Sequence, residues 1–203
     1  VKLIESGQLL EREHITEQMV ADSLEISRTP VRKAFQRLVC DNFLENIENA
    51  GGRVKSQELG SKGFLDRVNF IERLINYYLF DVEKNEKIIK TDELIEHLNE
   101  MEQTTNKSDY DFEFSEIDYW HDLLKNEENL YTKENILKPI HDILFDEGSI
   151  YAIQKNSRST KLTHLKELTK YLEEMNYAKA RREVRILFNK LKLNVLESGQ
   201  KFK

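Results

Sequence analysis

Residues 26–39 read Ile26-Ser27-Arg28-Thr29-Pro30-Val31-Arg32-Lys33-Ala34-Phe35-Gln36-Arg37-Leu38-Val39. Apolar residues recur in this stretch at the spacing i, i+3, i+4, i+7 and i+8, which aligns them along one side of a helix. They are Val31, Ala34, Phe35, Leu38 and Val39. Ser27 is a good N-cap, and Pro30 is tolerated because the first turn of a helix has no intrahelical N–H partners. The stretch therefore predicts an amphipathic helix that begins directly after Ser27.

The opposite side of this helix is basic. The basic and polar residues on or beside it are Arg28, Thr29, Arg32, Lys33, Gln36 and Arg37. No acidic residue occurs from Ile26 to Cys40. Such a side suits the major groove of DNA, where guanidinium groups reach guanine edges and helix N-termini favour anions. A solvated charged face on an ordinary surface helix is the competing interpretation, because most charge runs are of that kind.

A second short helix is expected just before the basic one. Residues 15–24 carry apolar side chains at helical spacing, with Thr16 as N-cap and Glu17 favourably placed in the first turn. Glu25 and Ile26 then form a tight turn. The segment is thus predicted to be a helix-turn-helix.

A β-hairpin is expected just after the basic helix. Two strand-like segments, 43–47 and 53–55, flank Gly51 and Gly52, which are expected to supply positive φ at the tip. Arg53 beside the tip contacts phosphate or the minor groove in one interpretation and is an ordinary exposed turn residue in the other. A hairpin in this place is the wing of a winged helix.

Length and charge limit the function classes. The chain has 203 residues, enough for one large domain or two small ones, and a net charge of −6. Residues 1–58 contain eight Lys or Arg and ten Asp or Glu, so only the basic helix is locally positive. This balance argues against a protein that coats nucleic acid without sequence preference.

Glycine and proline divide the chain into two parts. Five of the seven glycines fall in the first 63 residues, and Pro139 is the sole proline after Pro30. We therefore predict three regions: a winged-helix DNA-binding domain at 1–56, a linker at 57–63, and an all-helical effector-binding and dimerisation domain at 64–203. Because residue 1 is Val, the start is expected to be truncated. The expected helices of the third region span about 64–83, 91–104, 110–125, 131–146, 149–156, 161–174 and 177–198.

Two features of the helical region each have two interpretations. Pro139 is expected to kink or interrupt its helix. The last helix carries an apolar stripe that could build the bundle core or a subunit contact: Ala180, Val184, Leu187, Leu191 and Val195.

The cellular location is predicted from the cysteine count and from the absence of signal-peptide and membrane-spanning patterns in the sequence. Cys40 is a single cysteine with no internal disulfide partner, and it is expected to be a small buried hydrophobe. The sequence contains neither a signal-peptide pattern nor an apolar run long enough to span a bilayer. A cytoplasmic protein without membrane association is the prediction.

The helix-turn-helix segment resembles that of a known protein family. Ser27-Arg28-Thr29-Pro30-Val31-Arg32-Lys33-Ala34, preceded by Ile15-Thr16-Glu17-Gln18-Met19-Val20-Ala21, resembles the winged-helix domain of GntR-family bacterial transcriptional regulators over about residues 1–56. The resemblance implies that the basic helix reads an operator in double-stranded DNA and that the glycine tip enters the minor groove. Lys33 stands where the family commonly has Glu, which adds local positive charge. The predicted DNA-binding residues are Arg28, Thr29, Arg32, Lys33, Gln36, Gly51, Gly52 and Arg53.

The helical region is similar to the effector domain of the FadR-type branch, termed FCD-like. Many members hold a divalent metal with one Asp and three His and bind a small carboxylate beside it. Asp118 and His121 resemble the first ligand pair, although the family spacing is four residues and here it is three. His164 matches the second His motif, and the last His, expected near Leu187, is absent. The candidate ligands for a metal such as zinc are therefore the incomplete set Asp118, His121 and His164, with His141 or Glu183 as substitutes.

The alternative is a helical region without metal. Divalent metals in such a setting need several ligands that converge from different helices. In this interpretation His121 and His164 are hydrogen-bonded interior residues, and a wider apolar pocket takes the effector. The aromatic residues that could line such a pocket, or belong to the core, are Tyr77, Tyr78, Phe80, Phe112, Phe114, Tyr119, Trp120 and Tyr151.

The sequence thus favours a homodimeric, sequence-specific transcription regulator whose operator binding responds to a small-molecule effector. A regulator in which the helical region only dimerises is the first alternative. A metal-dependent helical enzyme is the second, and no H-E-x-x-H motif, phosphate-binding loop or nucleophile–base pattern supports it. We predict that the protein is not an enzyme.

Overall fold

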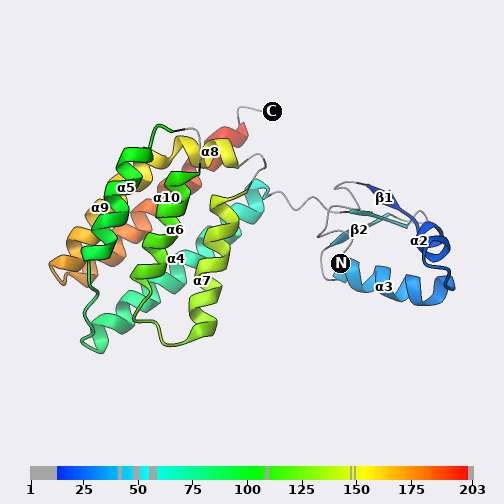
Figure 1. Ribbon diagram of the computed structural model, residues 1–203, viewed down its shortest axis with the longest axis horizontal. Helices are drawn as coiled ribbons and strands as arrows, with labels where there is room; N and C mark the ends of the chain where they lie inside the picture. Colours follow the sequence, from blue (N-terminus) through cyan, green and yellow to red (C-terminus); the bar gives the residue numbers. More distant parts are fainter. Residues whose placement is uncertain are drawn as a thin grey trace. The chain divides into compact units, whose positions relative to one another are not determined.

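The computed structural model describes residues 13–40, 43–47, 51–54, 59–107, 110–146, 148 and 150–200. The chain divides into two compact units, Val1–Gln57 and Glu58–Lys203 (Figure 1). The predicted fold class is confirmed, because a winged helix-turn-helix is followed by a helical bundle.

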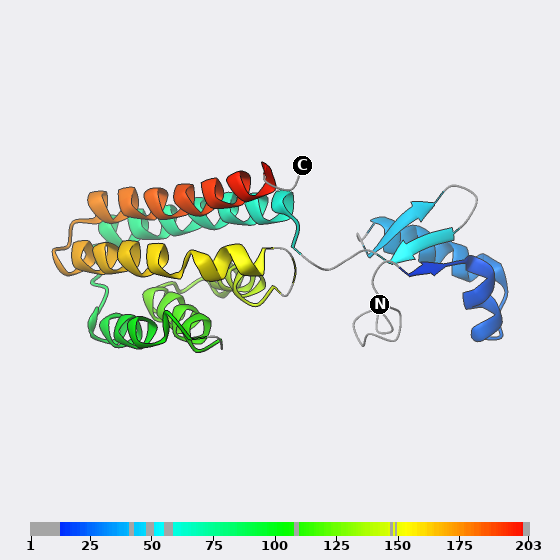
Figure 2. The ribbon, with the colours of Figure 1, turned by 90° about the horizontal axis from the view of Figure 1, so that it is seen from above.

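The first unit is a small sheet packed on two helices (Figure 2). Its elements are β1 (His14–Ile15), α2 (Glu17–Ser23), α3 (Arg28–Cys40), β2 (Leu44–Ile47) and β3 (Gly51–Val54). The strand order is β1-β3-β2, with both pairings antiparallel. The buried core consists of Ile15, Ala21, Val31, Phe35, Leu44 and Val54.

The helix-turn-helix forms where local chemistry predicts it. The Thr16 hydroxyl accepts a hydrogen bond from the Met19 amide at 3.1 Å, so α2 begins at Glu17. Ile15 was expected in this helix and instead lies in β1, paired with Gly52. The basic helix α3 begins at Arg28, as predicted. Of its expected apolar stripe, Val31 and Phe35 are buried, Leu38 and Val39 are half-buried, and Ala34 is exposed.

The wing differs from the expected hairpin in the placement and conformation of its two glycines. Gly51 and Gly52 belong to the central strand β3 and are not its tip, and residues 48–50, which join β2 to β3, lie outside the described part. Gly51 alone of the two has a positive φ, +99°. A Cβ at Gly51 would lie 2.4 Å from the carbonyl oxygen of Ile15, so this glycine permits close approach of β1 to β3.

The second unit is a bundle of helices. They are α4 (Ser61–Lys84), α5 (Asp92–Thr104), α6 (Asp111–Leu123), α7 (Leu130–Leu144), α8 (Tyr151–Asn156), α9 (Arg158–Glu173) and α10 (Tyr177–Gln200). Each lies within about three residues of its predicted span. Ser61–Gly63 were assigned to the linker and instead form the first turn of α4. Pro139 lies inside α7, which is continuous across it.

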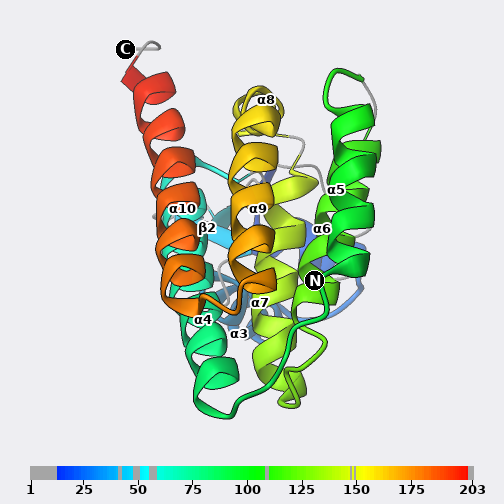
Figure 3. The same cartoon turned by 90° about the vertical axis from the view of Figure 1, so that its left-hand side faces the viewer.

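Helix pairs organise this bundle (Figure 3). Helix α4 packs between α10 and α7, α9 packs on α10 and α5, and α5 packs on α6. The apolar stripe of α10 is buried throughout and belongs to the core. Of the aromatic residues proposed for a pocket, Tyr77, Phe80 and Phe114 are exposed instead. No helix in the described ranges has the length and apolar character needed to cross a membrane.

Candidate nucleic-acid interface

Helix α3 presents its predicted DNA-binding residues to solvent. Arg28, Thr29, Arg32, Lys33 and Gln36 are all exposed, whereas Val31 and Phe35 on the other side pack in the core. The burial of one stripe against the sheet therefore fixes which side of α3 faces outward. Arg37 is exposed as well, and so is Cys40, which was expected to be buried.

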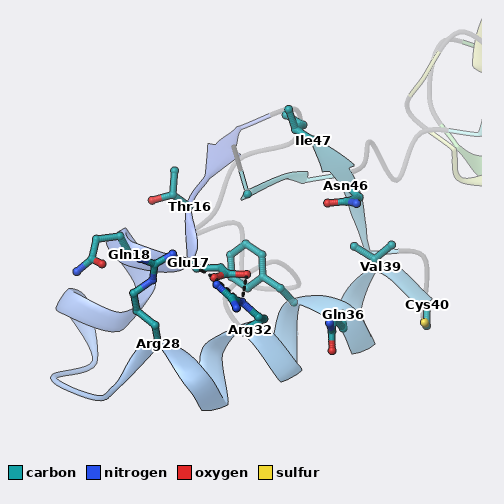
Figure 4. Close-up of a pocket in the computed structure, with 12 residues that line it drawn as sticks. Thr16, Glu17, Gln18, Arg28, Arg32, Gln36, Val39, Cys40, Asn46 and Ile47 are labelled. Atoms are coloured by element: carbon teal, nitrogen blue, oxygen red, sulfur yellow. Dashed lines mark hydrogen bonds and ion pairs between the residues drawn. The ribbon is translucent and has the colours of Figure 1, made fainter. Parts of the chain in front are cut away.

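The carboxylate of Glu17 on α2 forms ion pairs with Arg28 and Arg32. Nε of Arg32 donates hydrogen bonds to both carboxylate oxygens of Glu17, at 3.2 and 3.1 Å, and Nη2 of Arg28 lies 3.5 Å from Oε2 of Glu17 (Figure 4). The Glu17 side chain is only 20% exposed, against 56% for Arg28 and 61% for Arg32. Arg32 makes this contact through Nε, one of several N–H donors of its guanidinium group. Sequence reasoning assigned Glu17 only to the helix dipole and missed this role.

A groove of about 890 Å³ runs along α3 beside these residues (Figure 4). One wall is formed by Arg28, Arg32 and Gln36, which follow one another at intervals of four residues along α3. The facing walls are formed by the start of α2, at Thr16–Gln18, and by Asn46 and neighbouring wing residues. The groove therefore joins the helix-turn-helix to the wing as a single surface with donors and acceptors along it.

The three predicted wing residues are placed differently. Gly52 is buried and paired with Asn46 in the sheet, so the predicted minor-groove contact does not fit its position. Gly51 is half-buried and lines the groove. Arg53 is exposed in the central strand, opposite His14 on one side and Glu45 on the other, and not at a hairpin tip.

The predicted metal ligands are not brought together. Asp118 and His121 share a side of α6, but it is the solvent side. His164 is buried on α9, and its Nδ1 is hydrogen-bonded to the Glu183 carboxylate. Among the residues described, no three His, Cys, Asp or Glu side chains are placed to hold a metal ion together. The alternative of a hydrogen-bonded interior histidine is confirmed for His164 and wrong for His121.

Buried ion pairs join α6 to α9. Nε of Arg158 donates to Glu113 at 2.8 Å, and Nζ of Lys161 donates to Glu116 at 2.8 Å, with all four side chains at most 6% exposed. Burial raises the pKa of the Glu116 carboxyl above its usual range, although the Lys161 ammonium acts in the opposite direction. The sequence contains a signal for these pairs, because Glu113 and Glu116 are three residues apart on α6 and Arg158 and Lys161 are three residues apart on α9. The pairs were not predicted from this signal.

The first unit matches a known protein family. Residues 1–54 match the family model described as bacterial regulatory proteins, gntR family. The family is described as one of regulatory proteins. A search of curated proteins by sequence finds no match.

Solved structures share the fold over nearly the whole chain. A structure reported with Lar, which "controls the expression of the Listeria monocytogenes agr system and mediates virulence", is 18% identical with a TM-score of 0.65, covering 97% of this chain and 92% of that one. E. coli McbR/YncC is 16% identical with a TM-score of 0.57, covering 99% and 93%. A GntR-family transcriptional regulator from Pseudomonas syringae pv. tomato str. DC3000 is 16% identical with a TM-score of 0.54, covering 98% and 82%. At these identities the likeness shows the fold.

Proposed function

We propose that this chain, whose N-terminal unit is the winged helix of the gntR family of bacterial regulatory proteins, is a sequence-specific DNA-binding regulator of transcription. The observation that carries the proposal is the exposed row of Arg28, Arg32 and Gln36 on α3, with both arginines held by Glu17. Arginine forks recognise guanine O6 and N7, and glutamine recognises adenine N6 and N7. The row therefore has the chemistry to read bases and not only phosphates.

The proposed regulator binds as a homodimer in the bacterial cytoplasm. Two copies of α3 would enter successive major grooves of a pseudo-palindromic operator, with half-site centres about 34 Å apart. Lys33 and Arg37, on the outer side of α3, would contact phosphates and fix its position on the duplex.

We further propose that a small-molecule effector binds inside the helical unit. Both side-chain polar atoms of Gln154 and the Nε2 atom of His164 are buried without a hydrogen-bond partner within the described ranges. Buried polar atoms of this kind are normally satisfied, so a polar ligand or water would complete them. A ligand that binds the native state raises its apparent stability, and a thermal-shift screen of small carboxylates therefore tests the proposal. A regulator without effector would show no shift with any of them.

The DNA-binding proposal is tested by selection from a random duplex library. The purified protein should enrich a pseudo-palindromic sequence, and Arg32→Ala should bind that selected duplex about 10- to 100-fold more weakly. Arg185→Ala, which removes an exposed arginine from α10 in the helical unit, is the matched control and should bind like the wild type. Enrichment of no sequence would overturn the function, and equal affinity of both variants would remove Arg32 from the contacts.

A further inference from the structure

The chain enters the helical unit at Leu59, the first described residue after the winged-helix unit. The Leu59 amide donates a hydrogen bond of 2.7 Å to Oδ1 of Asp146, a residue 87 positions further along the chain. Leu59 is 6% exposed and Asp146 is 8% exposed, and the Leu59 side chain belongs to the bundle core. A buried carboxylate between α7 and α8 thus holds the backbone just before α4.

The second carboxylate oxygen of Asp146 leads to α8. Oδ2 accepts a hydrogen bond of 3.1 Å from the Gly148 amide, and the Gly148 carbonyl accepts one of 3.1 Å from the amide of Tyr151, the first residue of α8. Helix α8 lies at the end of the bundle at which α4 begins (Figure 2). A continuous series of hydrogen bonds therefore joins the start of α8 to the chain that enters α4.

Helix α8 buries a side chain that lacks hydrogen-bond partners. Gln154 is 1% exposed, and within the described ranges neither its Oε1 nor its Nε2 atom has a partner. The helix has only six residues and packs on α7, α9 and α10. An unsatisfied buried amide destabilises the arrangement that contains it, so a group that satisfies Gln154 changes the stability of α8. Helix α8 is therefore an element whose stability a polar ligand alters.

Asp146 lies between the two parts of the molecule that regulation must connect. We propose, resting on the function proposed above, that Asp146 couples α8 to the chain entering α4, so that ligand binding at Gln154 and DNA binding by the winged helix influence each other. Asp146 is a positioning residue, since it acts through the Leu59 amide. Coupling between two sites is reciprocal, so DNA alters α8 by the same factor by which a ligand on α8 alters DNA affinity. The selected duplex therefore serves as the probe of this coupling.

A purely local role for Asp146 is the competing interpretation. An aspartate side chain that accepts the amide two residues further on forms a common turn, and this accounts for Gly148. It does not account for Leu59, which belongs to a distant segment of the chain. A carboxylate accepts both amides at once, whereas asparagine does not, because one end of its side-chain amide is a donor. A local role predicts that Asp146→Asn changes stability and leaves the response of α8 to DNA as it is in the wild type.

Hydrogen exchange of the full chain with and without the selected duplex tests the coupling. In the wild type, the duplex should slow exchange of the α8 amides about fivefold or more. In Asp146→Asn that response should disappear, while the duplex still protects amides of the winged-helix unit. Asp142→Asn is the matched control, because Asp142 on α7 also contacts α4, through an ion pair with Arg67 at 3.8 Å, and it should respond like the wild type. A wild-type α8 that does not respond to the bound duplex, or an Asp146→Asn protein with the wild-type response, overturns the inference.

A second experiment without DNA separates the coupling from the DNA-binding function. Gln154→Leu removes both unsatisfied polar atoms and should slow exchange of the Leu59 amide about tenfold. Asp146→Asn should make that exchange about 10- to 100-fold faster and insensitive to Gln154→Leu. An unchanged Leu59 amide in Gln154→Leu contradicts the coupling, even where Asp146→Asn fails to fold. A wild type that selects no duplex refutes the DNA-binding function, and the response of Leu59 to Gln154→Leu then decides the coupling alone.

Discussion

At the scale of single residues, Glu17 links the two helices of the helix-turn-helix. Its carboxylate receives Arg32 at 3.1 Å and Arg28 at 3.5 Å, so both guanidinium groups are oriented before DNA arrives. Orientation in advance lowers the entropy lost on binding, because long side chains otherwise lose rotamer freedom at the interface. In the proposed complex the same negative charge would repel DNA phosphates and weaken attraction to any duplex. Glu17 would therefore favour discrimination over raw affinity.

Glu17→Gln is expected to lower specificity. The variant removes a charge that repels DNA, so affinity for a scrambled duplex rises, while the arginines lose their charge-assisted partner. The ratio of affinities for the selected and scrambled duplexes should fall about tenfold, measured by fluorescence anisotropy at one fixed salt concentration. Glu25→Gln removes the same charge from the turn between α2 and α3 and should change both affinities alike. Equal ratios in the two variants would exclude an orienting role for Glu17.

The buried Glu113–Arg158 pair is expected to be essential for the stability of the bundle. Arg158→Met leaves the Glu113 carboxylate buried without its cation, and breaking such a pair typically costs about 3–5 kcal/mol of unfolding free energy. The double variant Glu113→Leu/Arg158→Met should recover most of that loss, because no lone charge remains.

Urea denaturation followed by the fluorescence of Trp120 measures this effect, since the single tryptophan lies buried in the helical unit. Lys166→Met is the control. It breaks the exposed pair with Glu102, where Lys166 is 42% exposed, and should cost less than about 1 kcal/mol. A loss for Arg158→Met no greater than that of the control would contradict the prediction.

At the scale of elements, sequence periodicity located the helices well and the sheet poorly. A helix such as α4 repeats its buried positions over 24 residues, which fixes both its existence and its core side. Strand β1 has only two residues and forms because β3 offers it an edge, and no local signal encodes that partner. The placement of Gly51 and Gly52 was missed for the same reason: a glycine pair signals a tip, but close approach of β1 also requires glycine.

The candidate sites likewise combine features that local periodicity predicts with features that only tertiary packing decides. The outward side of α3 follows from its own apolar stripe, so the exposure of its basic residues was predictable. For the metal set, spacing correctly placed Asp118 and His121 on one side of α6, but only packing against α5 and α7 decides that this side faces solvent. A shared helical face is thus a necessary condition for a ligand pair and not a sufficient one.

Gly51→Ala is expected to destabilise the winged-helix unit by about 2 kcal/mol or more. The positive φ alone disfavours an L-residue by about 1–2 kcal/mol, and the new Cβ would clash with the Ile15 carbonyl oxygen. Hydrogen exchange of the β1 and β3 amides in the full chain should become faster. Gly60→Ala is the control, because a Cβ there meets nothing within 4 Å, and it should alter stability by less than about 1 kcal/mol. Unchanged exchange in Gly51→Ala would show that the strand contact is not needed.

At the scale of the whole molecule, a net charge of −6 means that DNA binding depends on few basic residues, and this makes its salt dependence countable. Each phosphate contact contributes about 0.9 to the slope of log K against log salt concentration. Lys33→Ala should therefore reduce that slope by about 1.8 if two copies occupy the operator and by about 0.9 if one does. Lys90→Ala, which removes an exposed lysine from the helical unit, should leave the slope unchanged. An unchanged slope in Lys33→Ala would remove Lys33 from the phosphate contacts, whereas a decrease near 0.9 would show that a single copy makes this contact with the operator.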